Sequence, residues 1–131
     1  MIYLDSSALV KLAILEAETD ELRSFLRANP DAKASSAIAT LEVVRAVRIV
    51  DDALLGKAFA VCAGLDLITV TDELLAEARD VAPPLLRTLD AIHLTSAKRI
   101  ARAGLAAFVA YDDRLLEAAA AAGLPTRSPG R

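Results

Sequence analysis

Short apolar runs alternate along the chain with longer runs in which apolar residues recur at helical spacing. Strands are predicted at Ile2–Leu4, Lys33–Ser35, Leu67–Val70, Ala107–Ala110 and Leu124–Arg127. Helices are predicted at 6–15, Thr19–Ala28, Ser36–Val50, Ala53–Ala63, Asp72–Val81, Leu89–Ala103 and 113–122. Strands that alternate with helices indicate an α/β fold with a mainly parallel central sheet. Ser6 or Ser7, Thr71 and Thr88 are expected to cap the helices that follow them.

The composition is that of one globular domain. Of the 131 residues, 55% are apolar and 25% are charged, and no linker or internal repeat interrupts the pattern. We therefore expect residues 1–131 to form a single domain, with 124–131 as an edge strand and a loose tail. Cys62 is the only cysteine, and no apolar run approaches the ~18 residues of a membrane span. A cytoplasmic protein without a membrane partner or internal disulfide is the expectation.

The net charge of −3 excludes a polybasic nucleic-acid binder, whose affinity depends on bulk positive charge. Aromatic residues make up only 4% of the chain, which disfavours a stacking platform for single strands. Neither number excludes an enzyme that acts on nucleic acid with the help of bound cations and local arginines.

Four acidic residues occupy positions that are unusual for acids. Asp5 directly follows the first predicted strand, and Asp112 follows the fourth after Tyr111. The ligand crevice of an α/β sheet lies beyond the carboxyl ends of its strands, so both side chains should reach the same crevice. Asp90 lies at a helix start, and Glu42 lies on an otherwise apolar face of its helix. A partly buried carboxylate such as that of Glu42 needs a partner.

Each acid also has a local explanation. Asp5 and Asp90 could favour helix dipoles, Asp112 could cap a helix, and Glu42 could pair with Arg45 one turn on. Taken together, carboxylates that converge on one crevice repel one another, and they stay ionised only if a cation offsets their charge. Hard oxygen ligands suit Mg²⁺ or Mn²⁺.

Other chemistries fit the chain poorly. His93 is the only histidine, so an acid–base ribonuclease with two histidines is impossible, and no serine has a nucleophile-elbow motif. A lone histidine one turn after Asp90 is more often a packed or supporting residue than a ligand. The chain has no phosphate-binding glycine loop and no Cys/His set for zinc.

Four segments of the chain resemble the PIN-domain family, and more closely the VapC-type toxins of bacterial toxin–antitoxin pairs. The segments are YLDSSALVKL, LEVVRAV, RTLDAIHLTSA and FVAYDDRLLEAA, in the family's order and spacing. The resemblance covers almost the whole chain. It implies a three-layer α/β/α sandwich with a mainly parallel sheet, and an endoribonuclease that depends on Mg²⁺ or Mn²⁺.

By position, Asp5, Glu42, Asp90 and Asp112 match the family's acidic quartet. The resemblance implies that Asp5, Asp90 and Asp112 hold the metal, with Glu42 as a ligand or water-orienting base and Asp113 as the reserve for Asp112. In a supporting role, Ser6 matches the hydroxyl residue after the first acid. The family often has a threonine where this chain has Ala110, so one hydroxyl is missing.

The mechanism we expect is hydrolysis of an RNA phosphodiester by metal-activated water, which leaves a 5′-phosphate and a 3′-hydroxyl. Five basic residues could steer the RNA backbone: Arg45, Lys98, Arg99, Arg102 and Arg114. The alternative for each of them is an ordinary solvated surface residue.

Partners follow from the same resemblance. It implies a cognate antitoxin and a homodimer. Seven apolar residues near the N-terminus could form a groove for an amphipathic antitoxin helix, or could all be core: Leu9, Leu12, Ile14, Leu15, Leu22, Phe25 and Leu26.

Three rival readings remain open. The first is a PIN nuclease in RNA processing. The second is a degenerate PIN fold that only binds a partner, for which Ala110 is the main support. The third is a receiver-like signalling domain, which would need a lysine near the C-terminus that this chain lacks.

Overall fold

A five-stranded sheet forms the centre of the molecule. The computed structural model describes all 131 residues. The strand order is β3-β2-β1-β4-β5, and every neighbouring pair runs parallel. The strands are short: β1 Ile2–Leu4, β2 Lys33–Ser36, β3 Asp66–Ile68, β4 Ala107–Val109 and β5 Thr126–Arg127.

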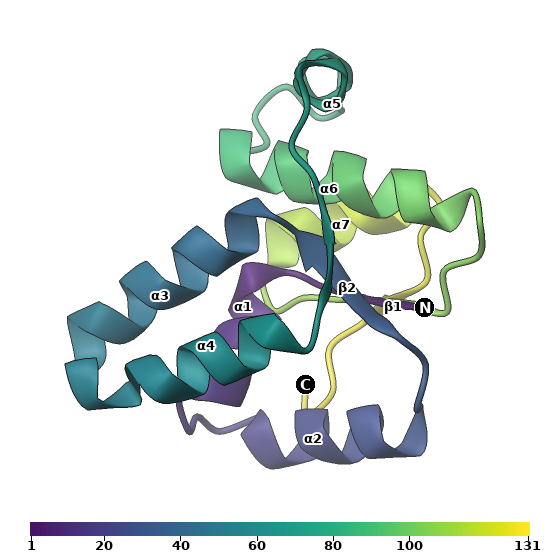
Figure 1. The fold of residues 1–131 in the computed structure, drawn as a ribbon. Helices are drawn as coiled ribbons and strands as arrows, with labels where there is room; N and C mark the ends of the chain where they lie inside the picture. The colour runs from purple at the N-terminus through teal and green to yellow at the C-terminus, as the bar shows by residue number, and fades with distance from the viewer.

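Helices cover both faces of the sheet (Figure 1). They are α1 Ser6–Ala13, α2 Thr19–Ala28, α3 Ile38–Val50, α4 Leu55–Ala63, α5 Asp72–Ala78, α6 Thr88–Ala101 and α7 Asp113–Ala121, with a 3₁₀ turn at Asp52–Leu54 before α4. One core cluster joins the sheet to α1–α4, and the other joins it to α6 and α7. The helix α5 packs on the outside of α6. The prediction of a three-layer α/β/α sandwich is confirmed.

Side-chain alternation along β1 explains why the two layers form. Ile2 and Leu4 point into the α1–α4 cluster, while Tyr3 between them points into the α6–α7 cluster. Along β4, Phe108 likewise points to the α6–α7 side. Because successive strand residues face opposite sides of a sheet, a fully apolar strand must be covered by helices on both faces.

The switch point of the sheet lies between β1 and β4. From β1 the chain proceeds outward through β2 to β3, and it then returns across the sheet to β4 on the other side of β1. In this register Leu4 lies beside Val109, and the Asp5 amide donates to the Val109 carbonyl at 3.0 Å. The residues that follow β1 and β4 are therefore neighbours, as expected for Asp5 and Asp112.

Several element boundaries differ from the prediction. Asp5, and not Ser6 or Ser7, is the N-cap of α1, with its Oδ1 accepting from the Ala8 amide at 3.0 Å. Thr88 is the first residue of α6 and does not cap it, whereas Thr71 caps α5 as predicted. Asp and Ser are similarly good N-caps, so the local sequence does not decide between them.

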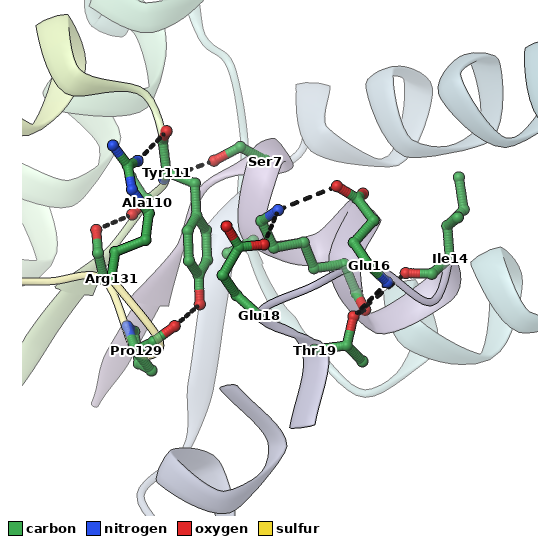
Figure 2. A network of polar contacts seen from close by, with 12 residues as sticks. Ser7, Ile14, Glu16, Glu18, Thr19, Ala110, Tyr111, Pro129 and Arg131 are labelled. Atoms are coloured by element: carbon green, nitrogen blue, oxygen red, sulfur yellow. Dashed lines mark hydrogen bonds and ion pairs between the residues drawn. The ribbon is translucent and has the colours of Figure 1, made fainter. Parts of the chain in front are cut away.

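The C-terminal segment is held in place, which corrects the expectation of a loose tail after β5. Ser128 donates to the Ala110 carbonyl, and the Tyr111 hydroxyl donates to the Pro129 carbonyl at 2.7 Å (Figure 2). Arg131 donates to the Tyr111 carbonyl and pairs with Asp113 at 2.6 Å. These bonds fasten residues 128–131 to the segment that follows β4.

Most of the N-terminal apolar residues belong to the core. Leu9 and Leu22 are fully buried, and four others pack partly buried against the same cluster: Leu12, Ile14, Phe25 and Leu26. Only Leu15 is exposed, at 75%. Of the two alternatives for these seven residues, a groove or the core, the structure of the chain by itself shows the core for all but Leu15. None of the helices is long and apolar enough to span a membrane.

Candidate active site

Asp5 is buried at the end of β1, with only 3% of its surface exposed. Its Oδ1 accepts from the Ser7 hydroxyl at 2.6 Å and from the Ala8 amide at 3.0 Å. Its Oδ2 has no hydrogen-bond partner, and since no fully buried side-chain oxygen lacks one, Oδ2 keeps some exposed surface. One oxygen of Asp5 is therefore fixed, and the other is free to bind a ligand.

Burial raises the pKa of Asp5 to about 6 from its usual 3.8. The negative charge of Asp90 adds to this rise, while the hydrogen bonds from Ser7 and Ala8 and the neighbouring His93 act in the opposite direction. The pKa of Asp5 is therefore raised mainly because burial removes its carboxylate from water, and the charge of Asp90 is the smaller cause.

Asp90 and Asp112 share one arginine. Asp90 lies in the first turn of α6, and Asp112 caps α7 by accepting from the Leu115 amide at 2.9 Å through Oδ1. Arg87 Nε donates to Asp90 Oδ2 at 2.9 Å, and Arg87 Nη2 donates to Asp112 Oδ2 at 3.2 Å. The guanidinium thus joins two carboxylates that come from different elements.

Glu42 is held from two sides on the inner part of α3. Its Oε2 accepts from the Ser6 hydroxyl at 3.0 Å, and its Oε1 lies 2.7 Å from His93 Nε2. His93 Nδ1 in turn lies 2.7 Å from the Tyr3 hydroxyl. The expected alternative, a pair between Glu42 and Arg45, does not form; Arg45 is exposed. The partners of Glu42 come from other helices.

The available donors determine where the protons lie in the series of hydrogen bonds from Tyr3 through His93 to Glu42. Tyr3 is fully buried, and burial raises its pKa, so the phenol is neutral. The Ser36 amide donates to the Tyr3 oxygen at 3.1 Å. Tyr3 can then donate to His93 Nδ1, which leaves the proton on Nε2 for Glu42. With this tautomer, Tyr3, His93 and Glu42 each have a hydrogen-bond partner.

Electrostatic effects connect the four acids. The charge of Asp90 raises the pKa of Asp5. Hydrogen bonding to Asp90 and the charges of Asp90, Asp112 and Glu42 raise the pKa of Arg87. The hydrogen bonds of Ser6, Ser7, Arg87 and His93 agree with this, because they place Asp5, Glu42, Asp90 and Asp112 at the same end of the sheet. Asp113 is not part of this group, because its side chain is 74% exposed and pairs with Arg131.

The donor set fits a hard divalent cation in its chemistry. All four predicted residues offer carboxylate oxygens, and one oxygen of Asp5 is unpartnered. As the side chains stand, no three acidic, histidine or cysteine side chains lie close enough together to hold one ion. Two of the four carboxylates are instead joined by the Arg87 guanidinium, a cation of this chain's own.

The basic residues predicted to steer RNA fall into two groups. Lys98 and Arg102 line a hollow with Glu77 beyond the middle of α6, and Arg99 pairs with Glu77 at 2.9 Å. A helix rises about 1.5 Å per residue, so these side chains lie more than about 10 Å along α6 from Asp90. Arg45 is exposed on α3, which carries Glu42, and Arg114 is exposed on α7, which Asp112 caps.

Sequence reasoning missed three residues at the site. Arg87 was not considered, although it precedes Asp90 by three positions, a spacing typical of ion pairs at a helix start. Tyr3 was assigned only to a strand, and Ser7 only to a helix cap. The Ser7 hydroxyl also accepts from the Tyr111 amide at 2.9 Å, so it connects α1 to the end of β4.

A hollow of about 430 Å³ opens beside Glu42. Its lining includes Ser6, Ser7, Lys11 and Tyr111. Lys11 pairs with Glu18 at 2.8 Å and lies 4.7 Å from the centre of the Tyr111 ring. Figure 2 shows Glu18 and Tyr111 in this network. Of the four site acids only Glu42 lines this hollow, whose walls are mostly polar and include one aromatic residue, Tyr111.

A parallel sheet with acids gathered at its switch point is the arrangement of PIN-domain proteins, and the PIN domain model matches residues 2–121. Two relatives from Mycobacterium tuberculosis are 42% identical to the chain. Ribonuclease VapC47 aligns over 99% of this chain and 98% of its own, and Ribonuclease VapC46 over 98% and 97%. The chain belongs to the PIN-domain family, in its VapC branch, as the four sequence segments had indicated.

A solved structure supports the fold independently. The crystal structure of Mycobacterium tuberculosis VapC20, described as a toxin that cleaves the sarcin-ricin loop, superposes with a TM-score of 0.76. The superposition covers 98% of this chain and 100% of VapC20, at 19% sequence identity. At that identity the likeness concerns the fold alone.

Proposed function

We propose that this chain is an endoribonuclease that depends on Mg²⁺ or Mn²⁺ and acts as the toxin of a toxin–antitoxin pair. The observation that carries this proposal is the gathering of Asp5, Glu42, Asp90 and Asp112 from four separate segments at the switch point of the sheet. The names of its relatives, which describe ribonucleases, support the substrate class.

In this proposal the residues divide the work. A bound divalent cation would lower the pKa of a water molecule and offset negative charge on the phosphate. Asp5, through Oδ2, and Asp90 and Asp112 would hold that cation. Glu42, fixed by Ser6 and His93, would orient the attacking water or accept its proton. Ser7 keeps Asp5 in place by donating to its other oxygen.

The test is cleavage of defined RNAs with Mg²⁺, Mn²⁺ or EDTA, followed by mapping of the product ends. We expect internal cuts that need the cation and leave 5′-phosphate and 3′-hydroxyl ends. Asp5→Asn should abolish the cleavage, and Asp66→Asn, on the exposed edge strand β3, is the matched control. Cuts that persist in EDTA, or in the Asp5→Asn variant, would refute the proposal.

The antitoxin is the second part of the proposal. We propose that an amphipathic helix of the antitoxin docks on the α1–α4 layer, where apolar side chains of Leu15, Leu41 and Phe59 are 58–75% exposed. The proposal includes a homodimer and a cytoplasmic location. Co-expression with the product of an adjacent reading frame, followed by size-exclusion chromatography, would reveal the complex and the number of copies.

A nuclease in RNA processing would share the same chemistry, and growth on expression of the free chain separates the two. Arrest of growth that the antitoxin relieves supports the toxin. The degenerate binder is less favoured, because Ala110 is fully buried in the α6–α7 core cluster and does not line the crevice.

A further inference from the structure

We propose that Arg87 is an internal counter-cation that a divalent ion must displace before it can bind both Asp90 and Asp112. The inference rests on the proposed metal dependence, and it assigns to this chain a residue that lowers the metal affinity of its own site. The geometry of the two ion pairs carries it.

The first step concerns which oxygens are available. Asp112 has one oxygen engaged by the Leu115 amide, because it caps α7 through Oδ1. Oδ2 is the oxygen that the helix cap leaves free, and this is the atom that accepts from Arg87 Nη2 at 3.2 Å. Arg87 also takes Oδ2 of Asp90 at 2.9 Å. A divalent ion shared by the two carboxylates therefore competes with the guanidinium for the oxygen of each that Arg87 holds.

The second step concerns charge. The negative charges of Asp90, Asp112 and Glu42 each raise the pKa of Arg87, so its guanidinium lies within the electrostatic field of three of the four acids. A divalent cation placed among the same carboxylates would lie close to the positive charge of Arg87 and be repelled by it. Arginine and metal thus compete for the same negative charge.

The third step concerns whether the arginine can leave. Its side chain is 66% exposed, and its backbone is extended at the N-cap position, outside the helix. Its side chain makes no hydrogen bond other than those to Asp90 and Asp112. Rotation of the side chain into solvent would break two ion pairs and no core packing, so displacement is inexpensive.

The size of the effect follows from these pairs. An exposed ion pair changes an equilibrium constant by about 1.5- to 5-fold. Two such pairs, both lost when the metal binds, lower the metal affinity by about 2- to 30-fold. The alternative, in which Arg87 holds the two carboxylates in position for the metal, predicts a change of the opposite sign.

The experiment measures Mn²⁺ binding by isothermal titration calorimetry without RNA, so it does not depend on activity. Arg87→Gln should bind Mn²⁺ about 2- to 30-fold more tightly than the parent. Arg87→Lys should lie between them, because lysine keeps the charge but cannot bridge two carboxylates with one planar group. Arg23→Gln, which removes an arginine of α2 that pairs with Asp20, is the matched control and should bind like the parent.

Unchanged or weaker binding by Arg87→Gln would overturn the inference while leaving the metal-dependent nuclease intact. Absence of Mn²⁺ binding by the parent and by all variants would overturn both the Arg87 inference and the metal dependence on which it rests. RNA cleavage in EDTA would then show that the proposed metal dependence is the part that fails. Thermal unfolding in EDTA checks that each variant is folded. If Arg87→Gln is unfolded, the lysine variant decides, since its affinity must still exceed that of the parent.

Discussion

At the scale of single residues, the site depends on carboxylates whose two oxygens do different work. Asp5 uses Oδ1 to start α1 and leaves Oδ2 to the crevice, and Asp112 uses Oδ1 to start α7. The local explanation and the functional one are therefore both correct for these acids. A residue that caps a helix at the end of a strand is also held rigidly at the place where ligands bind.

The pKa of Asp5 leads to a prediction about stability. Because the folded pKa, about 6, is above the usual 3.8, the folded protein binds this proton more tightly than the unfolded chain does. The ionised carboxylate thus lowers the free energy of unfolding above pH 6, by about 3 kcal/mol at most. Asp5→Asn should raise that free energy by about 1–3 kcal/mol at pH 7.5 in EDTA, since asparagine still caps the helix.

The difference in the free energy of unfolding between Asp5→Asn and the parent should shrink as the pH falls from 6. It should vanish below about pH 4, where Asp5 is protonated in both the folded and the unfolded parent. Urea unfolding of the parent, Asp5→Asn and Asp66→Asn across this range measures it. A variant that is less stable than the parent at pH 7.5 would show that burial does not strain the carboxylate.

At the scale of elements, three helices and a strand meet at Glu42. The acid is on α3, and its partners Ser6 and His93 are on α1 and α6. The Tyr3 hydroxyl of β1 is hydrogen-bonded to the other ring nitrogen of His93, Nδ1. The orientation of one catalytic candidate thus depends on how the two helical layers pack across the sheet.

Ser6→Ala removes one of the two bonds to Glu42. We expect RNA cleavage to fall about 10-fold, as is usual when a supporting hydrogen bond is lost at a metal site, while the protein stays folded. Ser24→Ala on the exposed surface of α2 is the control. Cleavage at the parental rate would mean that His93 alone orients Glu42.

The same scale shows what a sequence can predict. The pattern of apolar runs located all five strands and the mainly parallel sheet, because burial on both faces of β1 and β4 leaves continuous apolar runs, whereas the layered sandwich was implied by the family resemblance. They placed Asp5 and Asp112 in one crevice, and the strand order agrees. The partner of Glu42 was not predictable, because His93 is 51 positions away and only tertiary packing brings them together. The structure also has a 3₁₀ turn at Asp52–Leu54, which Asp51 caps locally, and it begins β3 at Asp66 and not at Leu67.

At the scale of the whole molecule, the C-terminal segment joins the end of β4 to the start of α2. It crosses from β5 toward α2, and Gly130 approaches Glu18 so closely that a Cβ would lie 3.1 Å from the Glu18 Cβ. Gly130 also has a positive φ of 91°. The segment holds Tyr111 and Asp113, which flank the site acid Asp112.

Gly130→Ala should therefore lower the free energy of unfolding by about 1–2 kcal/mol, because alanine is disfavoured at positive φ and its methyl group would contact Glu18. Gly56→Ala in α4, with open space around the new methyl group, should raise it by about 0.5–1 kcal/mol. Thermal unfolding of both variants measures the contrast. Equal melting temperatures for Gly130→Ala and the parent would mean that the segment is not fastened in solution.

The central claim is that Asp5, Asp90 and Asp112 together form one cation-binding site beside Glu42. Anomalous diffraction from crystals soaked in Mn²⁺ tests it most directly. The account predicts a peak about 2–2.5 Å from Asp5 Oδ2 and from the carboxylates of Asp90 and Asp112, with the Arg87 side chain turned away. A peak elsewhere on the molecule, or none at Mn²⁺ concentrations that support RNA cleavage, would contradict it.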